Sequence, residues 1–258
     1  MKSLFLSVLI CITASTAFCQ KLVIMTYNIR HGEGIDNKVD IKRIAAVINR
    51  YHPDMVALQE VDSVTNRNGK VNQMEELGKL TGMNSCYGRN FVYDGGSYGL
   101  GILSRFPITE TRQLRLPYYT DDANSPTRLL FAATLQVTPD TKLQFCTVHL
   151  DYKKASQRKI QAEALLKLIP DSIPVVLAGD FNAEPTEETL QIIRTAFEPL
   201  IPGDNTFTFP ADKPGTKIDH VFLGKNFRWI NRKQQVIDEE QASDHRPLLA
   251  RVKLKGKK

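Results

Sequence analysis

Two polar residues follow an apolar run near the middle of the chain, where the sequence reads VVLAGDFNAEP over residues 175–185. The apolar part predicts a buried β-strand, with Asp180 directly after it. Because side chains alternate along an extended chain, Asp180 and Asn182 are expected on one side and Phe181 on the other, packed inward. Gly179 is expected to keep the approach clear. A carboxylate and an amide on one side could activate a water molecule and hold an anion.

Similar polar residues stand beside other strand-like runs. A single polar residue at a strand end is most often a turn former, but a repeated set indicates a site if the carboxyl ends of these strands converge. Carboxylates, amides and imidazoles together suit a hard cation with acid–base groups around it. Phosphoester hydrolysis needs such groups, because a positioned water attacks phosphorus and the leaving oxygen must be neutralised. The candidates are Asn28, Glu60, His149, Asp180, Asn182, Asp219, Asp244 and His245.

The ligand types favour magnesium over zinc. Magnesium prefers oxygen ligands and is commonly held by one or two carboxylates together with substrate phosphate, a demand that Glu60 with Asn28 meets. Zinc would require more histidine or cysteine, and the 5 histidines do not stand at the short spacings of a structural zinc site.

The elements that must position these residues form one mixed α/β domain. Asp40 can cap a helix with apolar residues at helical spacing, and several strand-like runs follow one another without a helix between them. This order argues against a doubly wound parallel sheet and for two packed sheets with helices outside. Strands are predicted at residues 22–27, 55–58, 100–103, 129–137, 143–150, 173–178, 218–223 and 247–252, and helices from 41 to 48 and at 73–80, 156–168 and 186–196.

The first residues, 1–20, have the layout of a secretory signal peptide. Lys2 precedes an apolar run at residues 4–12, and small residues lead to an expected cut after Cys19 or Gln20. The run is shorter than the roughly 20 residues that span a bilayer, so no transmembrane segment is predicted. We therefore expect an exported protein, periplasmic or extracellular, with residues 21–258 as its domain. A lipid anchor through Cys19 is disfavoured because a bulky residue precedes it.

The composition is that of a folded domain with a mildly basic surface. The chain has 258 residues and a net charge of +6, with 42% hydrophobic and 24% charged residues, which excludes disorder. The charge suits phosphorylated or acidic partners, although the basic residues are scattered. Cys86 and Cys146 could pair in an exported protein or remain free thiols, and both alternatives stay open. No obligate protein partner is indicated.

Taken together, the motifs resemble the endonuclease/exonuclease/phosphatase superfamily, which includes deoxyribonuclease I, sphingomyelinases and inositol-polyphosphate 5-phosphatases. Each short motif alone is weak, but the motifs stand in family order and span residues 21–252. They are Thr26-Tyr27-Asn28-Ile29-Arg30, Leu58-Gln59-Glu60-Val61, the GILSRFP stretch at 101–107, Val148-His149-Leu150, Gly179-Asp180-Phe181-Asn182, Ile218-Asp219-His220 and Ser243-Asp244-His245-Arg246-Pro247.

The resemblance implies a fold and a metal. The fold would be a four-layer α/β/β/α sandwich, in which two packed mixed β-sheets are flanked by helices and the site lies at one edge of the sheets. Glu60 would be the principal Mg²⁺ ligand, with Asn28 beside it and Asp244 on the metal side, directly or through water. Mn²⁺ would be able to substitute for Mg²⁺.

The same resemblance implies roles for the acid–base groups. Asp180 would orient or deprotonate the attacking water, and Asn182 would hold the phosphate or the water. Asp219 would orient His245, which would contact the phosphate or act as the base. His149 would protonate the leaving group or bind phosphate.

Substrate contacts are predicted at three further positions. Arg30 belongs to the first motif, and Lys153 belongs to a small basic patch that follows His149. Tyr98 stands in a glycine-rich stretch predicted to be a loop near the site.

Three other histidines and one arginine are predicted to be structural. Strand alternation should turn His220 away from the side that Asp219 faces. His31 and His52 are predicted to be surface or turn residues, and Arg105 also has a structural interpretation.

Three functions remain in order of preference. The first is an exported magnesium-dependent phosphodiesterase or phosphatase that acts on a small phosphoester, an inositol or sugar phosphate, or a lipid head group. The second is a secreted nuclease for DNA or RNA, which would need phosphate contacts along an extended basic face. The third is an inactive phosphate-binding module, which is disfavoured because every matched catalytic position is filled. Abasic-site repair is disfavoured because Val148-His149-Leu150 replaces the motif of that branch.

Overall fold

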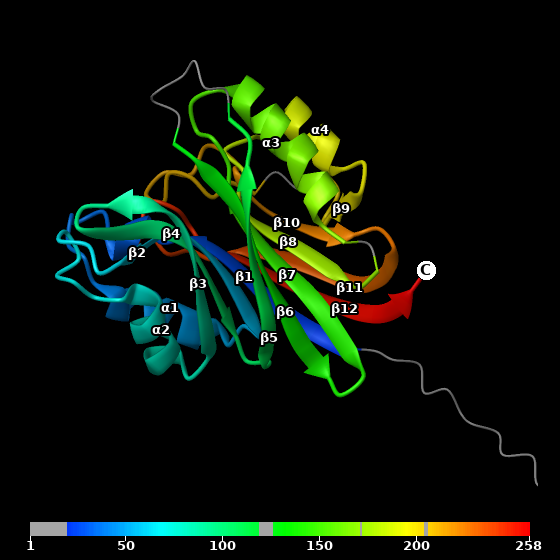
Figure 1. The fold of residues 1–258 in the computed structure, drawn as a ribbon, viewed down its shortest axis with the longest axis horizontal. Helices are drawn as coiled ribbons and strands as arrows, with labels where there is room; N and C mark the ends of the chain where they lie inside the picture. Colours follow the sequence, from blue (N-terminus) through cyan, green and yellow to red (C-terminus); the bar gives the residue numbers. More distant parts are fainter. Residues whose placement is uncertain (1–19, 119–125, 171, 204–205) are drawn as a thin grey trace, which may run out of the picture.

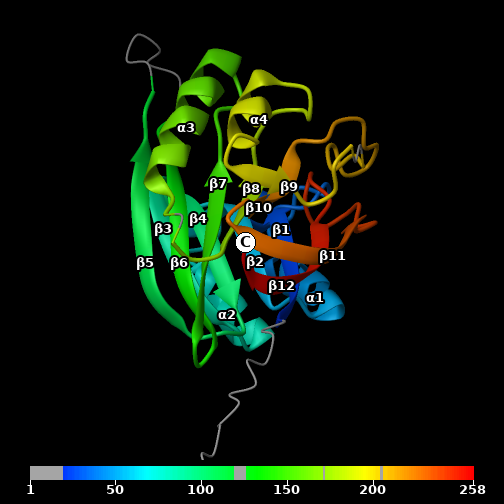
Figure 2. The ribbon, with the colours of Figure 1, turned by 90° about the vertical axis from the view of Figure 1, so that its right-hand side faces the viewer.

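The chain folds into two β-sheets packed face to face, with helices on both outer faces (Figures 1 and 2). A computed structural model describes residues 20–118, 126–170, 172–203 and 206–258. The signal-peptide prediction for residues 1–20 therefore lies, except for Gln20, outside the described residues. Each sheet has 6 strands, both sheets contain parallel and antiparallel pairs, and the predicted four-layer sandwich is confirmed.

The first sheet is built from the two ends of the described chain. Its strand order is β11-β12-β1-β2-β4-β3, in which β1 pairs parallel with β2 and antiparallel with β12. The strands are β1 Gln20–Asn28, β2 Met55–Ser63, β3 Asn84–Tyr93, β4 Gly96–Ser104, β11 Phe227–Val236 and β12 Leu248–Lys257.

The second sheet comes from the middle of the chain. Its order is β5-β6-β7-β8-β10-β9, with β7 and β8 parallel and β10 antiparallel to β8. The strands are β5 Ile108–Leu116, β6 Arg128–Thr138, β7 Thr141–His149, β8 Val175–Asp180, β9 Phe197–Pro199 and β10 Asp219–Gly224.

Two helices cover each sheet. In Figures 1 and 2, α1 and α2 lie on one side of the molecule and α3 and α4 on the other. Asp40 caps α1 as predicted, because its side chain accepts a hydrogen bond from the Lys42 amide at 2.9 Å. The helices are α1 Ile41–Tyr51, α2 Gln73–Thr81, α3 Ala155–Leu168 and α4 Glu188–Ile193, with a short 3₁₀ turn, η1, at Arg30–Gly32.

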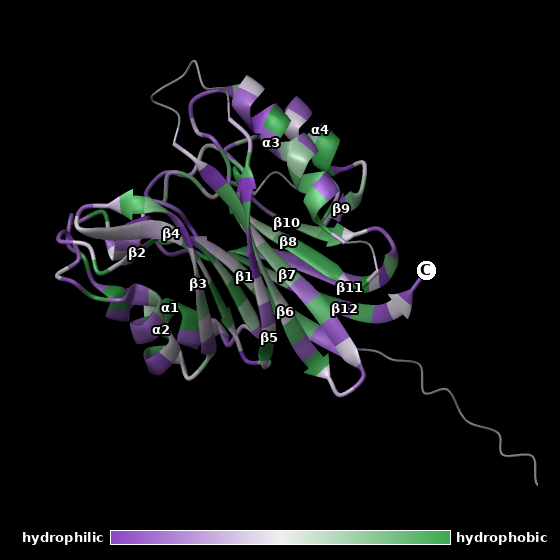
Figure 3. Ribbon diagram, in the orientation of Figure 1, coloured by the Kyte–Doolittle hydropathy of each residue, from purple (hydrophilic) through white to green (hydrophobic). Residues whose placement is uncertain are grey.

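The inner faces of the sheets are apolar in their middle and polar at one edge. Figure 3 shows the hydrophobic residues concentrated on the central strands and the hydrophilic residues on the connecting loops. Alternate residues of β7 illustrate the change, since Phe145 belongs to the core between the sheets whereas Thr147 and His149 are buried polar residues. The polar edge is therefore where the strands can bring functional side chains together.

Cys86 and Cys146 are both free, so the pairing alternative is ruled out in this structure. Burial raises the pKa of the Cys86 thiol to about 12, which makes it inert. Among the described residues, no helix is both long and apolar enough to cross a bilayer.

Candidate active site

Three adjacent strands of the second sheet place His149, Asp180 and Asp219 side by side. His149 ends β7 and is the register partner of Asp180, which ends β8. Asp219 begins β10 and also lies opposite Asp180, because β10 runs antiparallel to β8. The expected convergence of carboxyl ends thus needs correction, since β10 contributes its amino end to the same edge.

The first sheet contributes Asn28 and Glu60 to this edge. Asn28 ends β1 opposite Gln59, and Glu60 follows inside β2, where a register shift between Leu58 and Val61 interrupts the pairing with β4. Glu60 adopts a left-handed φ of 59°, a conformation that costs a residue other than glycine about 1–2 kcal/mol. The irregularity turns the Glu60 carboxylate out of the strand alternation and toward the site.

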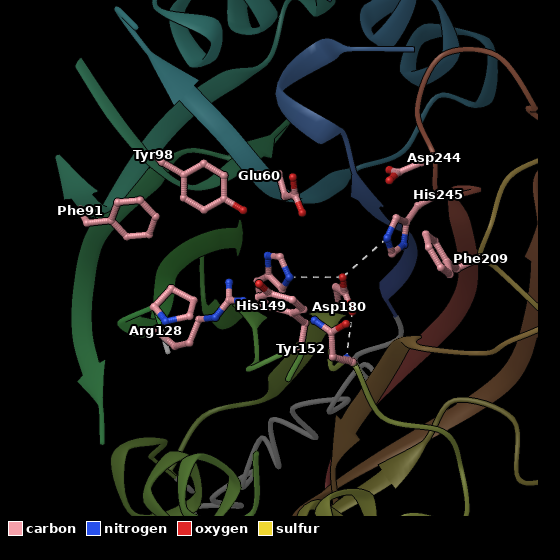
Figure 4. A pocket seen from close by; sticks show the side chains of 12 residues that line it. Glu60, Phe91, Tyr98, Arg128, His149, Tyr152, Asp180, Phe209, Asp244 and His245 are labelled. Carbon is pink, nitrogen blue, oxygen red and sulfur yellow. Dashed lines mark hydrogen bonds and ion pairs between the residues drawn. The ribbon is translucent and has the colours of Figure 1, made fainter. Parts of the chain in front are cut away.

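Polar contacts join the two halves of the site across the sheets, and Figure 4 shows those that Asp180 makes with His149 and His245. Asn28 donates from Nδ2 to Asp180 Oδ2 at 3.1 Å and to Glu60 Oε1 at 3.3 Å. His245, which precedes β12 of the first sheet, binds Asp219 of the second through Nδ1 and Oδ2 at 2.9 Å. His245 Nε2 then lies 3.8 Å from Asp180 Oδ2, and His149 Nε2 lies 3.5 Å from the same oxygen.

Asn182 and Phe181 lie on opposite sides, as the sequence predicts. Phe181 is fully buried in the core beneath α3 and α4, whereas Asn182 lines the cavity. Asn182 lies just beyond β8 with a φ of 48°, which asparagine tolerates better than most residues. Gly179 has a different role from the expected one, because a Cβ there would come within 2.2 Å of the Val148 carbonyl oxygen. It permits close approach of β7 and β8, rather than access of a substrate.

A cavity of about 320 Å³ opens at this edge. Acid–base groups and Glu60 line it together with aromatic side chains. Arg128, which begins β6, is 3% exposed, and its Nε has no hydrogen-bond partner in the part of the chain that the structure describes. Arg128 is not among the residues predicted from the sequence, where it is recognisable only as a cation that begins an apolar run. The cavity is lined by Glu60, Phe91, Tyr98, Pro126, Arg128, His149, Tyr152, Asp180, Asn182, Phe209, Asp244 and His245.

The surroundings push the acid–base groups toward different protonation states. Burial raises the pKa of Asp180, and the neighbouring Asp219 carboxylate raises it further. Burial lowers the pKa of His245, but the charge and hydrogen bond of Asp219 outweigh burial and raise it overall. Burial, together with the charges of Arg128 and His245, lowers the pKa of His149 well below its usual value. At neutral pH His245 is therefore the charged imidazole and His149 the neutral one.

The oxygen ligands at the cavity fit a hard cation. Glu60 and Asp244 both line the cavity with carboxylates. Among the described residues Asn28 Oδ1 accepts one hydrogen bond, from the Arg30 amide at 3.1 Å. A second group, Asp180, Asp219 and His245, offers ligand atoms within 4.8 Å of one another. Its His245 Nδ1 and Asp219 Oδ2 already bind each other, so Glu60 with Asp244 suits the cation better.

Of the three predicted substrate contacts, one lines the cavity and two do not. Tyr98 lines it, but lies in β4 and not in a loop. Arg30 pairs with Glu33 at 3.2 Å and Asp244 at 3.8 Å, outside the lining residues. Lys153 is exposed, with Nζ 5.4 Å from the Tyr152 ring centre. Substrate contact by Arg30 and Lys153 stays a prediction.

The remaining histidines have structural surroundings. His220 is buried against Phe181, and its Nε2 lies 2.9 Å from the Ala183 carbonyl, as strand alternation predicts. His52 is exposed at the left-handed end of α1. His31 lies in the 3₁₀ turn η1, as the turn alternative of its prediction requires, and is 8% exposed.

The sandwich, with this acid–base set at its edge, defines an enzyme of the deoxyribonuclease I-like class, which hydrolyses phosphoesters. The chain belongs to the Endonuclease/Exonuclease/phosphatase family, whose model matches residues 25–245.

Similar proteins support the family and the fold. The uncharacterized protein YbhP of Escherichia coli (strain K12) is 24% identical over 249 residues, which cover 90% of this chain and 96% of YbhP. An endonuclease/exonuclease/phosphatase structure from Beutenbergia cavernae is 23% identical with a TM-score of 0.74, and the match covers 92% of this chain and 72% of that one. A mannosyl-6-phosphatase of Bacteroides thetaiotaomicron is 18% identical with a TM-score of 0.68, and the match covers 90% and 99% of the two chains.

Proposed function

We propose that this chain is an exported, divalent-metal-dependent hydrolase that cleaves a small phosphoester with an activated water. The esterified alcohol is an inositol, a sugar or a lipid head group. The observation that carries the proposal is the cavity of about 320 Å³, which joins Asp180 and both site histidines to the buried cation Arg128. A volume of this size suits a small molecule.

The acid–base groups have separate roles in this proposal. Asp180 takes the proton of the attacking water, and its raised pKa makes it a stronger base than an ordinary aspartate. His245, kept protonated by Asp219, donates a hydrogen bond from Nε2 to a phosphate oxygen. His149 is neutral, and its Nε2 orients the Asp180 carboxylate without adding a charge.

Two further groups neutralise the phosphate. Mg²⁺ or Mn²⁺ held by Glu60, with Asn28 and Asp244 beside it, would offset charge on the phosphate and the leaving oxygen. Arg128 contributes a fixed guanidinium inside the cavity, where no carboxylate of the described residues forms an ion pair with it. Asn182 donates from Nδ2 to the Leu150 carbonyl at 3.1 Å, which fixes its amide while Asn182 still lines the cavity.

The proposed substrate class is supported by the size of the cavity and by one protein of similar fold. A nuclease would need phosphate contacts that continue along a strand, whereas the fixed cation, Arg128, lies inside the cavity. One protein of similar fold is a mannosyl-6-phosphatase, which is consistent with a sugar phosphate.

A substrate panel under one magnesium condition tests the proposal. Sugar phosphates, inositol phosphates, phosphoinositides, sphingomyelin, RNA and plasmid DNA are incubated with the protein and with Asp180→Asn as the inactive control. We expect turnover of a small or head-group ester by the wild type alone. Plasmid nicking at physiological salt, without turnover of the small esters, would replace the proposal with the nuclease alternative. If no ester is turned over, the proposal is contradicted and the inactive phosphate-binding module is the alternative that remains.

Export is a separate proposal that rests on residues 1–20. Fractionation of cells expressing the full chain tests it, and we expect a shortened product outside the inner membrane. A full-length product confined to the cytoplasm would contradict export without affecting the proposed chemistry.

A further inference from the structure

An aromatic pair forms the end of the cavity farthest from His245. Phe91 of β3 and Tyr98 of β4 both line the cavity, and their rings stack with centroids 5.0 Å apart and planes 22° from parallel. In Figure 4 the pair lies at one end of the cavity and Phe209 and His245 lie at the other. His149 and Asp180 thus lie between the aromatic pair and the end of the cavity that Phe209 and His245 form.

A register shift brings the two rings to the same face. β3 and β4 pair regularly up to Arg89, after which one residue is skipped and Phe91 becomes the cross-strand partner of Tyr98. Partners directly opposite each other share a face of the sheet. Without the shift, Phe91 would not stand opposite Tyr98, so the irregularity creates the stacked pair.

A chain of contacts from Asp62 through Arg67 and Tyr93 supports the pair. Asp62, which is fully buried, receives two hydrogen bonds from Arg67 at 2.6 and 2.8 Å, and Arg67 lies 4.6 Å over the ring of Tyr93. Tyr93 in turn packs edge-on against both rings of the pair, at 6.2 and 6.5 Å. The stacked rings are a preformed surface, and a preformed surface loses little entropy when a ligand binds.

From this arrangement we propose that Phe91 and Tyr98 form a subsite for the leaving group, and that this group contains a ring whose face packs on the pair. This inference rests on the proposed function and narrows its substrates to esters of a cyclic alcohol. Flat apolar faces attract the C–H face of a sugar or cyclitol ring and the π-face of a nucleoside base alike. An open-chain alcohol such as glycerol offers no such face.

Matched esters and variants test the subsite. The substrates are phosphate mono- and diesters of myo-inositol, glucose, adenosine and glycerol, and the variants are Phe91→Ala, Phe91→Leu and Val92→Ala. Val92 is the adjacent residue on β3 and is 74% exposed, so Val92→Ala controls for disturbance of the hairpin. Circular dichroism and Tm establish that each variant is folded.

We expect Phe91→Ala and Phe91→Leu to lower kcat/KM about tenfold for the ring-bearing esters, mainly through KM, as loss of a stacking contact does. The glycerol esters should change less than about threefold, and Val92→Ala should match the wild type. Comparison of the losses in kcat/KM for the inositol and glucose esters with the loss for the adenosine esters identifies the kind of ring that the pair binds. Equal losses on glycerol and ring esters, or no loss with Phe91→Ala, overturn the subsite. Absence of hydrolysis of every ester by the wild type would instead contradict the proposed function.

Discussion

Gln59 of β2 donates a hydrogen bond from Nε2 to Thr147 Oγ1 of β7 at 2.9 Å, so the two sheets are joined directly behind the site. Both residues are fully buried. Gln59 directly precedes Glu60, and Thr147 stands two residues before His149. The bond therefore sets the position of the expected metal ligand relative to the acid–base groups.

Thr147→Val should weaken both the fold and catalysis. The change keeps the shape but leaves the buried Gln59 amide without its partner, which costs about 1–3 kcal/mol of the free energy of unfolding. We expect kcat to fall about tenfold because Glu60 is no longer held in place, and Thr147→Ser to restore it. Denaturant unfolding and steady-state kinetics measure the two effects. Thr134→Val, in the middle of β6, is the matched control; an equal kcat loss there would refute the positioning role.

Asp180→Asn should abolish activity without loss of stability. Removal of a general base lowers kcat by about 10²–10⁴-fold. The raised pKa of Asp180 means that its buried charge opposes folding at neutral pH. The variant with the neutral amide should therefore have a Tm equal to or above that of the wild type, when both are measured in chelator so that no metal contributes. His245→Ala should lose kcat by a similar factor. Near-normal turnover of either variant would place the hydrolytic centre elsewhere.

Chelation should stop hydrolysis, and Mg²⁺ or Mn²⁺ should restore it. Glu60 is the expected principal ligand, so Glu60→Gln should require at least about tenfold more Mg²⁺ for half-maximal rate. Glu110→Gln, an exposed change on β5, is the control and should match the wild type. A rate that is indifferent to chelator would contradict the metal requirement.

His220 should make folding stability depend on pH between 4 and 6.5. Burial, helped by the charge of Lys217, lowers its pKa from 6.5 to about 4 in the folded chain. In that window the unfolded chain binds a proton that the folded chain does not, so stability falls as pH falls, by up to about 3 kcal/mol. Urea unfolding at several pH values should show a shallower fall in His220→Gln. The exposed His52→Asn is the control, and an identical slope in all three proteins would contradict the assignment.

The strands that the sequence did not predict are the four sheet edges, β3, β5, β9 and β11. An edge strand is solvated along one side and needs no continuous apolar run, so periodicity does not detect it. β5, for example, reads ITETRQLRL and is mostly exposed. The central strands were predicted because both of their faces are buried.

The same distinction explains the site. Asp180, His149 and Asp219 were predicted because they adjoin buried central strands that carry clear motifs. Phe91 was missed because it lies on the edge strand β3, and its place in the cavity depends on a register shift that a single sequence does not show. Arg128 was missed because a cation at the start of a strand has many uses, and only the cavity around it distinguishes them.

The pairing of β12 with β1 has a consequence for the order in which the enzyme becomes active during synthesis. His245 and Asp244 lie just before β12, which is synthesised after the other strands that the structure describes and must dock beside β1, which is synthesised before them. Strands β1 to β10 can emerge and associate earlier, yet the imidazole that faces Asp180 arrives only at the end. The proposed site therefore stays incomplete in the nascent chain until β12 has docked beside β1.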